Sequence, residues 1–542
     1  MKKRLLITVI ILFLSVSGCT FDMNVPNNNE PDSDRVLATP ADVEGLIAGA
    51  FREYWFTVNG HYPGEGLSVL GDEKVSMWKK WGMLDFQLEP RRMWNNSATY
   101  SHAAFTETPW FGNYRVISDV NSALNEILDG MQIGKSGSTD TQRAIAFGKF
   151  CQGLAHGYLG LFFNKAFIYP EGVELQEYSP EFVYSGTVTR SAIYQLEECI
   201  RICDEYSFTL PPTWINGLTI TNEDLKNICH SLIARYMVLD SRRYEVRAAV
   251  DWIAVLSHIE QGITEDFSPE GNGEEWWHPV QYSSNWKGWF TANNRLIGPS
   301  DTSDNYSNWL DTPSGNRRPF FISSPDRRIT GDFSGMTDGK WFAWIYMLWE
   351  SPIPPNYNSR YESTKFEYQY PDAYGPMPFL TVTEMDMLRA EAYLRGYGGT
   401  KTDAAQLINK TRVLNGEMEP LTGDESDIEL WRWMCYEKRM ETQLTGIAYF
   451  DYRSWAGMKV DGELVIHCPS GTMVEFPVPR KELNTLLMDD TYPFKGFVEI
   501  YWPWTTPSKK SSGMVLDSEY IRKARERINR YNRSKNAIPV RK

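Results

Sequence analysis

Residues 141–163 carry the helical pattern that most constrains the fold. Apolar and small side chains recur there at intervals of three and four residues, from Ala144 through Phe147, Gly148 and Cys151 to Phe162. Side chains at this spacing share one face of an α-helix, and the small ones allow a second helix to approach closely. Such a helix must be buried against other helices, so the pattern predicts a helical core.

Helix-capping signals and similar apolar periods occur elsewhere in the chain. Thr39, Pro40 and Asp42 form an N-cap, a first-turn proline and a capping acid, and Ser426–Glu429 forms a capping box. Thr383 is predicted to cap a further helix. The periodic segments predict helices within these ranges: 43–54, 115–128, 193–203, 225–236, 248–259, 385–392 and 404–411.

Short turns between neighbouring periodic segments favour antiparallel helix pairs. We therefore predict a mostly α fold with a tetratricopeptide-like helix-pair scaffold, although the strict 34-residue consensus of that repeat is not visible. Residues 464–467 and 473–476 flank a Pro-Ser-Gly turn, which predicts a small hairpin.

Residues from about 263 to 380 interrupt the helical rhythm, because they are rich in Gly, Pro, Asn, Asp, Ser and Trp. A connection of this length is either functional or disordered, and its many aromatic residues argue against disorder. We predict a single domain over 37–542, in which a scaffold (about 37–262 and 381–542) carries this large loop-rich insert with a few short strands.

The N-terminus has the layout of a bacterial lipoprotein signal. A basic start precedes an apolar run, Leu5–Leu14, which is too short to span a membrane, and small residues then lead to Cys19. We predict a signal peptide over 1–18, lipid attachment at Cys19 and a flexible polar tether over 19–36. The alternative is a secreted protein without a lipid, and it leaves Cys19 unexplained.

Charge and motifs exclude several classes of function. A formal net charge of −14 repels nucleic acid and anionic membrane, so we expect no nucleic-acid partner and membrane contact through the lipid only. The phosphate-loop, dinucleotide, HExxH and GxSxG motifs are missing, and we predict no metal, no cofactor and no catalytic residue. Five cysteines lie at apolar positions of helical segments, where buried free thiols are the first interpretation and disulfides the alternative: Cys151, Cys199, Cys203, Cys229 and Cys435.

Several segments resemble the SusD/RagB family of outer-membrane nutrient-binding lipoproteins. Residues 37–46 are similar to its first helix, 387–393 (Met-Leu-Arg-Ala-Glu-Ala-Tyr) to its "LxRAEAY" helix, and 403–415 to the helix after it. Residues 436–455 resemble "ERxxELxxEGxRxxDLxRW", and 476–484 resemble the closing "xPIPxxExxxN".

This resemblance implies a surface-exposed lipoprotein, lipid-anchored in the outer membrane, whose insert holds the ligand site. The acidic tether after Cys19 is similar to the surface-export pattern of Bacteroidota lipoproteins. The implied partners are an oligosaccharide or polysaccharide and a SusC-like TonB-dependent transporter, on which the protein would sit as a lid. RagB-like members capture peptides instead, so peptide capture stays open.

The chain contains 20 tryptophans, more than a core requires. An indole plane covers the flat C–H face of a sugar ring, with hydrophobic and dispersion gains. Trp276 and Trp277 are neighbours that point opposite ways in an extended segment, so one of them can be exposed. The predicted ligand-binding residues are Trp81, Trp94 and Asn95 in one region, and Trp276, Trp277, Trp286, Trp289 and Trp309 in the other.

A surface glycoside hydrolase is the third interpretation. Glu274 and Glu275 could form its pair of acids, but sequence neighbours rarely converge on one bond at the separation of roughly 5–10 Å that catalysis needs. We therefore expect a binding protein and not an enzyme.

Overall fold

The computed structural model describes residues 37–173, 181–332, 335–346, 357–488 and 492. The predicted signal peptide, Cys19 and the tether lie outside these residues. No helix in the described part of the chain combines the length and the apolar character that crossing a membrane requires.

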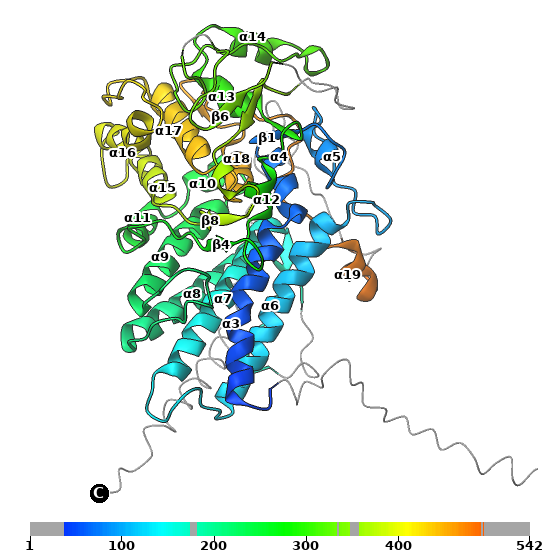
Figure 1. Ribbon diagram of the computed structural model, residues 1–542, viewed down its shortest axis with the longest axis vertical. Coiled ribbons are helices and arrows are strands. Elements are labelled where there is room, and N and C mark those ends of the chain that lie inside the picture. Colours follow the sequence, from blue (N-terminus) through cyan, green and yellow to red (C-terminus); the bar gives the residue numbers. More distant parts are fainter. Residues whose placement is uncertain (1–36, 174–180, 333–334, 347–356, 489–491, 493–542) are drawn as a thin grey trace, which may run out of the picture.

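Long helices that lie side by side form the lower part of the molecule in Figure 1. They are α3 (Pro40–Asn59), α6 (Ala104–Leu128), α7 (Asp140–Phe162), α8 (Ser185–Glu205) and α9 (Asn222–Leu239), followed by α10 (Tyr244–Ala248) and α11 (Trp252–Glu260). Thr39 caps α3 with the predicted capping box. The mostly helical fold is therefore confirmed.

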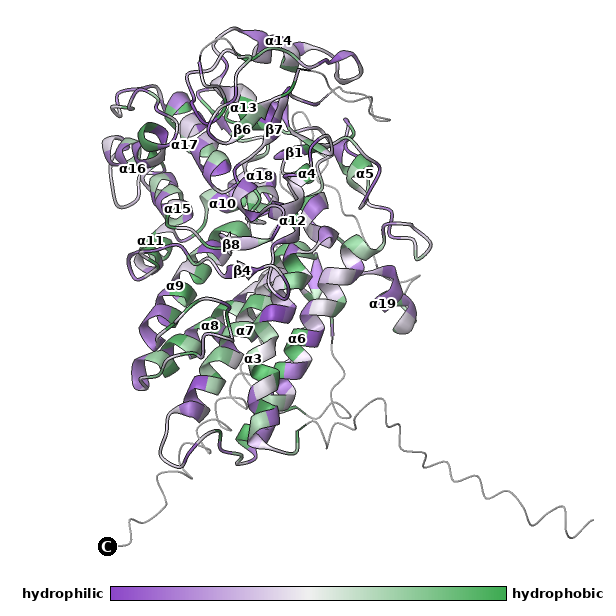
Figure 2. Cartoon of the chain, in the orientation of Figure 1, coloured by the Kyte–Doolittle hydropathy of each residue, from purple (hydrophilic) through white to green (hydrophobic). Residues whose placement is uncertain are grey.

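Helix α7 lies at the centre of this bundle, as its pattern predicts. Its glycines face neighbouring helices so closely that an added Cβ would clash: Gly153 meets Leu196 of α8, and Gly157 meets Tyr236 of α9. Figure 2 shows hydrophilic residues along the outer surfaces of the same helices. The five helical cysteines are buried, and no disulfide joins them among the described residues.

A second helical group lies at the upper left of Figure 1. It comprises α15 (Val382–Leu394), α16 (Lys401–Leu414) and α17 (Asp427–Glu441), and α18 (Ala448–Trp455) and α19 (Arg480–Thr485) follow. The predicted cap at Thr383 is wrong, because Thr381 accepts the hydrogen bond from the Glu384 amide and Thr383 lies inside the helix.

The predicted hairpin is also misplaced. The strands are β9 (Lys459–Val460) and β10 (Glu463–Leu464), whose turn contains Asp461 and Gly462 with positive φ. Residues 473–476 instead extend beside the end of α7, where Phe476 bridges Phe163. A two-residue turn that requires positive φ favours glycine, and this is a stronger hairpin signal than Pro-Ser-Gly.

Short elements occupy the remaining described residues. Between α3 and α6 lie η1 (His61–Glu65), α4 (Gly66–Leu70), β1 (Lys74–Ser76) and α5 (Met83–Gln87), and β2 (Lys165–Ala166) pairs with β3 (Val183–Tyr184). The loop-rich region contains β4 (Glu270–Asn272), α12 (Pro279–Ser283), β5 (Phe290–Ala292), α13 (Asn294–Ile297), η2 (Gly298–Ser300), α14 (Asn305–Asp311), η3 (Ser314–Asn316), β6 (Phe342–Trp344), β7 (Tyr361–Ser363), η4 (Glu367–Gln369) and β8 (Tyr374–Pro376). Its strands form antiparallel pairs: β4 with β8, β6 with β7, and β5 with β1.

Buried ion pairs connect the two helical groups. The Arg247 side chain of α10 is fully buried and lies 2.6 Å from Glu391 of α15 and 2.8 Å from Asp451 of α18. Lys438 of α17 lies 2.8 Å from the other oxygen of Asp451. Removing one partner of a buried pair leaves an uncompensated charge, so Arg247 holds three helices together at a point that tolerates little change.

We predict that Arg247→Met lowers the free energy of unfolding by about 3–5 kcal/mol, because Glu391 and Asp451 remain buried with less compensating charge. Arg395→Met is the matched control, since Arg395 also pairs with Glu391, at 2.8 Å, but is partly exposed. Among the ion pairs of the described residues, none joins Arg395 to Asp451. Urea unfolding of both variants should show a clearly smaller loss for the control. Equal losses would contradict a special role for Arg247.

The buried His156 of α7 predicts a pH dependence of stability. Its Nδ1 lies 3.0 Å from both the Gln152 carbonyl and the Gln195 side-chain oxygen, and burial lowers its pKa to about 4. An unfolded chain protonates histidine near pH 6.5, so the free energy of unfolding should fall by up to about 3 kcal/mol as the pH drops from about 6.5 to about 4. His156→Gln should show a shallower decline over this range in thermal or urea unfolding. A curve parallel to that of the parent would show that another group is responsible.

Candidate functional site

Pairing of two strands more than 200 residues apart gathers several tryptophans. Strand β1 pairs antiparallel with β5, with Ser76 opposite Phe290. Beyond this register the Met77 amide donates to the Trp289 carbonyl at 2.9 Å, and the Trp78 indole donates to the Gly288 carbonyl at 3.2 Å. The segment that follows β1 therefore lies beside the segment that precedes β5.

Three half-buried indoles result from this pairing, and we call Trp81, Trp286 and Trp289 the indole cluster. The ring centroids of Trp286 and Trp289 are 5.0 Å apart in an edge-to-face arrangement, and Trp81 lies 6.2 and 6.4 Å from them. Aromatic rings attract one another in such geometries, so the cluster stays in place while part of each ring faces outward.

A buried ionic group supports the cluster from behind. The Trp81 indole stacks on the His61 ring, with 4.1 Å between centroids and 13° between planes. His61 Nδ1 lies 3.3 Å from the buried Glu65 carboxylate, which also pairs with Lys74. Burial raises the pKa of Glu65, but Lys74 and His61 more than offset this effect, so the pKa lies below its usual value.

The backbone at Trp81 adopts a conformation that large side chains rarely take. Its φ is +50°, and that of Gly82 is +74°. Residues held in the left-handed region cost free energy and cluster at functional sites. The stack on His61 holds the indole in this orientation.

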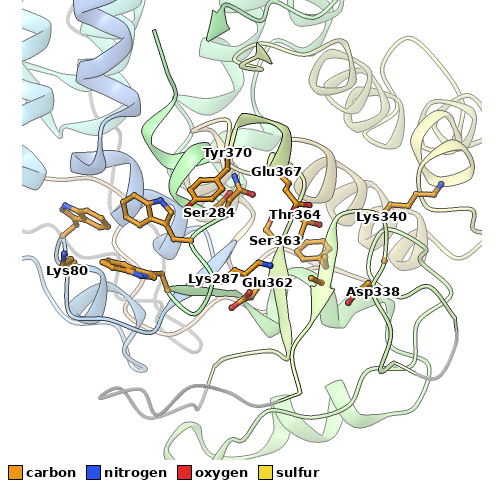
Figure 3. Close-up of a pocket in the computed structure, with 17 residues that line it drawn as sticks. Lys80, Ser284, Lys287, Asp338, Lys340, Glu362, Ser363, Thr364, Glu367 and Tyr370 are labelled. Atoms are coloured by element: carbon orange, nitrogen blue, oxygen red, sulfur yellow. The ribbon is translucent and has the colours of Figure 1, made fainter. Parts of the chain in front are cut away.

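The indole cluster forms one wall of a cleft with a volume of about 960 Å³ (Figure 3). The segment after α12, which carries Trp286 and Trp289, belongs to this wall. The other walls come from β6 and the residues before it, and from β7 to Tyr370. The lining residues are Lys80, Trp81, Ser284, Asn285, Trp286, Lys287, Trp289, Asp338, Gly339, Lys340, Phe342, Ala343, Glu362, Ser363, Thr364, Glu367 and Tyr370. The cleft thus combines flat aromatic surfaces with hydroxyl, carboxylate and ammonium groups.

Glu362 joins the β7 wall of the cleft to the tryptophan segment. Its carboxylate accepts a 2.7 Å hydrogen bond from the Gly288 amide between Trp286 and Trp289. Burial raises the pKa of this carboxyl, while the amide and the nearby Lys287 oppose the increase. The bond orients the loop that carries two of the three indoles.

The structure places some of the predicted ligand-binding residues in the cleft and others outside it. Trp81, Trp286 and Trp289 line the cleft. Trp277 is half-buried beside the cluster and does not line the cleft. Its ring centroid lies 6.2 Å from that of His61 and 5.5 Å from that of Tyr282. Trp276 points the opposite way, as expected for neighbours, and is buried against Phe51 and Trp55.

Two further predicted tryptophans and one asparagine lie outside the cleft. Trp94 is buried among Phe86, Phe105 and other core aromatics, so an accessible indole is a wrong prediction there. Trp309 is buried between the guanidinium groups of Arg295 and Arg317, 5.1 and 4.4 Å from its centroid. Asn95 is exposed, and its side-chain oxygen accepts from the Ser97 amide.

Sequence reasoning missed the polar walls of the cleft. Lys80 and Lys287 adjoin predicted tryptophans, and this adjacency was the available signal. The stretches 338–343 and 362–370 show no comparable pattern. Long-range strand pairing brings them to the site, and such pairing leaves no local signal in the sequence. In the described ranges, no three His, Cys, Asp or Glu side chains are placed to hold a metal ion together.

Comparison with known proteins supports the fold. No family model and no curated protein sequence matches the chain. Among solved structures, a SusD homolog from Parabacteroides distasonis matches with a TM-score of 0.56 and 12% identity, over 84% of this chain and 96% of the homolog. A SusD-like carbohydrate binding protein from Bacteroides fragilis matches with a TM-score of 0.55 and 14% identity, over 82% and 98%.

A SusD/RagB family protein from Bacteroides thetaiotaomicron matches with a TM-score of 0.52 and 12% identity, over 83% of this chain and 95% of that protein. Each similarity spans most of both chains. The chain therefore has the fold of the SusD/RagB family.

Proposed function

We propose that the protein is a cell-surface glycan-binding lipoprotein that captures oligosaccharides in the cleft. The indole cluster in a cleft with polar walls is the observation that carries this proposal. Sugar rings stack their C–H faces on indole planes, and side chains such as Ser363, Thr364 and Glu367 can bond the hydroxyl groups at the ring edges. The fold adds support, since one similar structure is that of a SusD-like carbohydrate binding protein.

Cys19 would anchor the protein by its lipid to the outer membrane, with the binding domain at the cell surface. We further propose that a SusC-like TonB-dependent transporter receives the captured oligosaccharide, with this protein as its lid. The transporter would then supply the coupling to energy, because binding alone in the cleft performs no work.

Peptide capture is the alternative within the same fold, and it would use an open strand edge beside the cleft. Strand β6 borders the cleft, but two groups on its outer edge are already bonded. The Phe342 carbonyl accepts from the Gly339 amide at 2.8 Å, and the Trp344 amide donates to Asp338 at 2.7 Å. This edge offers little to an incoming peptide, and the aromatic wall favours a glycan.

Hydrolysis is not part of the proposal. Glu274 and Glu275 are exposed and do not line the cleft, and both of their amides bond the Asn272 side chain in a turn. We expect glycans incubated with the protein to remain uncut.

We predict that Trp81→Ala, Trp286→Ala and Trp289→Ala each weaken glycan binding about tenfold or more, a loss of about 1.4 kcal/mol or more, because each removes a stacking surface. Trp433→Ala is the control, since Trp433 is also half-buried but does not line this cleft. Isothermal titration against a glycan panel, with peptides included, measures the effect, and thermal melts check that each variant folds. Unchanged affinity in all three variants, or binding of peptides alone, would contradict the proposal.

We predict that Cys19→Ala prevents lipid attachment, because alanine lacks the sulfur atom to which the lipid would be joined. Labelled palmitate should enter the parent protein and not the variant, and the variant should leave the outer-membrane fraction. Equal labelling of both proteins would show that the lipid is attached elsewhere.

A further inference from the structure

We propose that the saccharide bound in the cleft is anionic, and that Lys80 and Lys287 bind its negative charge. This inference rests on the proposed function and adds the chemical class of the ligand. The charge would be the carboxylate of a uronic acid or a sulfate ester, because both present anionic oxygens at the edge of a pyranose ring.

Lys80 lies where an acidic substituent of a stacked sugar would reach it. Its ammonium nitrogen is 4.8 Å from the Trp289 ring centroid and 5.9 Å from that of Trp81. A pyranose that stacks on these indoles points its substituents outward from the edge of the sugar ring, toward the groups around the aromatic surface. Figure 3 shows Lys80 at one end of the cleft and Lys287 nearer its middle, next to Glu362.

Neither lysine has an acidic partner among the ion pairs of the described residues, although the chain is strongly acidic. Other lysines of the fold have such partners, as Lys149 pairs with Glu171 and Lys438 with Asp451. Lys340, at the other end of the cleft, lies 2.7 Å from Glu417. No ion pair of the described residues therefore occupies the two cations of the indole wall, although Lys287 also opposes the rise in the pKa of the nearby Glu362.

Of the acidic residues that line the cleft, Asp338 and Glu367 lie away from the indole cluster, whereas Glu362 lies beside it. Asp338 accepts from the Trp344 amide and lies beside Lys340 at the far end in Figure 3. Glu362 is buried and held by the Gly288 amide, and burial raises its pKa. Glu367 lies on η4 on the opposite wall. Lys80 and Lys287 thus lie beside the indoles, where the carboxylate of Glu362 is buried and already accepts a hydrogen bond, and this arrangement suits a sugar with one anionic substituent.

Isothermal titration with matched pairs of saccharides tests the inference. One pair is oligogalacturonate and its methyl ester, and the other is a sulfated galactan oligosaccharide and its desulfated form. We expect one charged member to bind at least fivefold more tightly than its neutral partner, with a preference that shrinks as NaCl is raised. The pair that shows the preference distinguishes carboxylate from sulfate.

Lys80→Gln and Lys287→Gln should each reduce this preference about threefold to fivefold, the range expected for one partly exposed ion pair. Lys79→Gln is the matched control, because Lys79 is an exposed neighbour that carries the same charge and does not line the cleft. Lys80→Arg should retain most of the preference. An equal loss in Lys79→Gln would mean that only the overall charge matters, which overturns the inference.

A broader glycan array separates this inference from the proposed function. Binding of neutral glycans with no preference for charge, unaffected by Lys80→Gln, would overturn the anionic ligand and leave glycan capture standing. An array without any binding glycan would overturn both.

Discussion

The guanidinium of Arg439 donates hydrogen bonds to three backbone carbonyls: Arg295 at 2.7 Å, Gly71 at 3.0 Å and Asp72 at 3.1 Å. Gly71 and Asp72 precede β1, and Arg295 follows β5, so one side chain of α17 holds both strands of the pair. The Leu444 amide also donates a 2.7 Å hydrogen bond to the carboxylate of the buried Glu73, which lies between Asp72 and β1. A planar guanidinium can serve several acceptors in fixed directions, which an ammonium cannot do as well. The register that gathers the indole cluster depends on this contact with the helical scaffold.

The indole cluster illustrates how aromatic residues remain available in a folded protein. Twenty tryptophans favour burial by their apolar area, and several of them are in the core or against guanidinium groups, as Trp276 and Trp309 are. Trp81 is not buried further because its indole stacks on the His61 ring, which Glu65 holds in place. Polar support behind a ring therefore leaves the opposite part of the ring to line a cleft. The same arrangement places the Lys80 ammonium 4.8 Å from the Trp289 ring centroid, so the proposed stacking and charge recognition can act on one sugar.

Much of the scaffold can be predicted from local pattern, whereas only part of the site can. Predicted and observed helices agree wherever a cap and an apolar period occur together, as at Thr39 and Ser426. Errors arise where local signals compete, as with the neighbouring threonines 381 and 383. The polar neighbours of Trp81, Trp286 and Trp289 allow these residues to be predicted as ligand-binding. Trp94, however, lies in an equally polar stretch and is buried. Composition around a tryptophan does not report which side of the backbone its ring occupies.

The sequence by itself determined where helices with a clear cap begin, as after Thr39 and Ser426, and which helix faces are apolar, because caps and periodic burial act over three or four residues. It also determined the abundance of indoles and the two regions in which some of them lie among polar neighbours. Only the tertiary structure decided which indoles share a cleft, since the pairing of β1 with β5 joins residues more than 200 positions apart. The walls from 338–343 and 362–370 depend on the same long-range packing. Strand register and buried hydrogen bonds such as those of Arg439 are set by contacts across the whole domain, and no local pattern of residues encodes them.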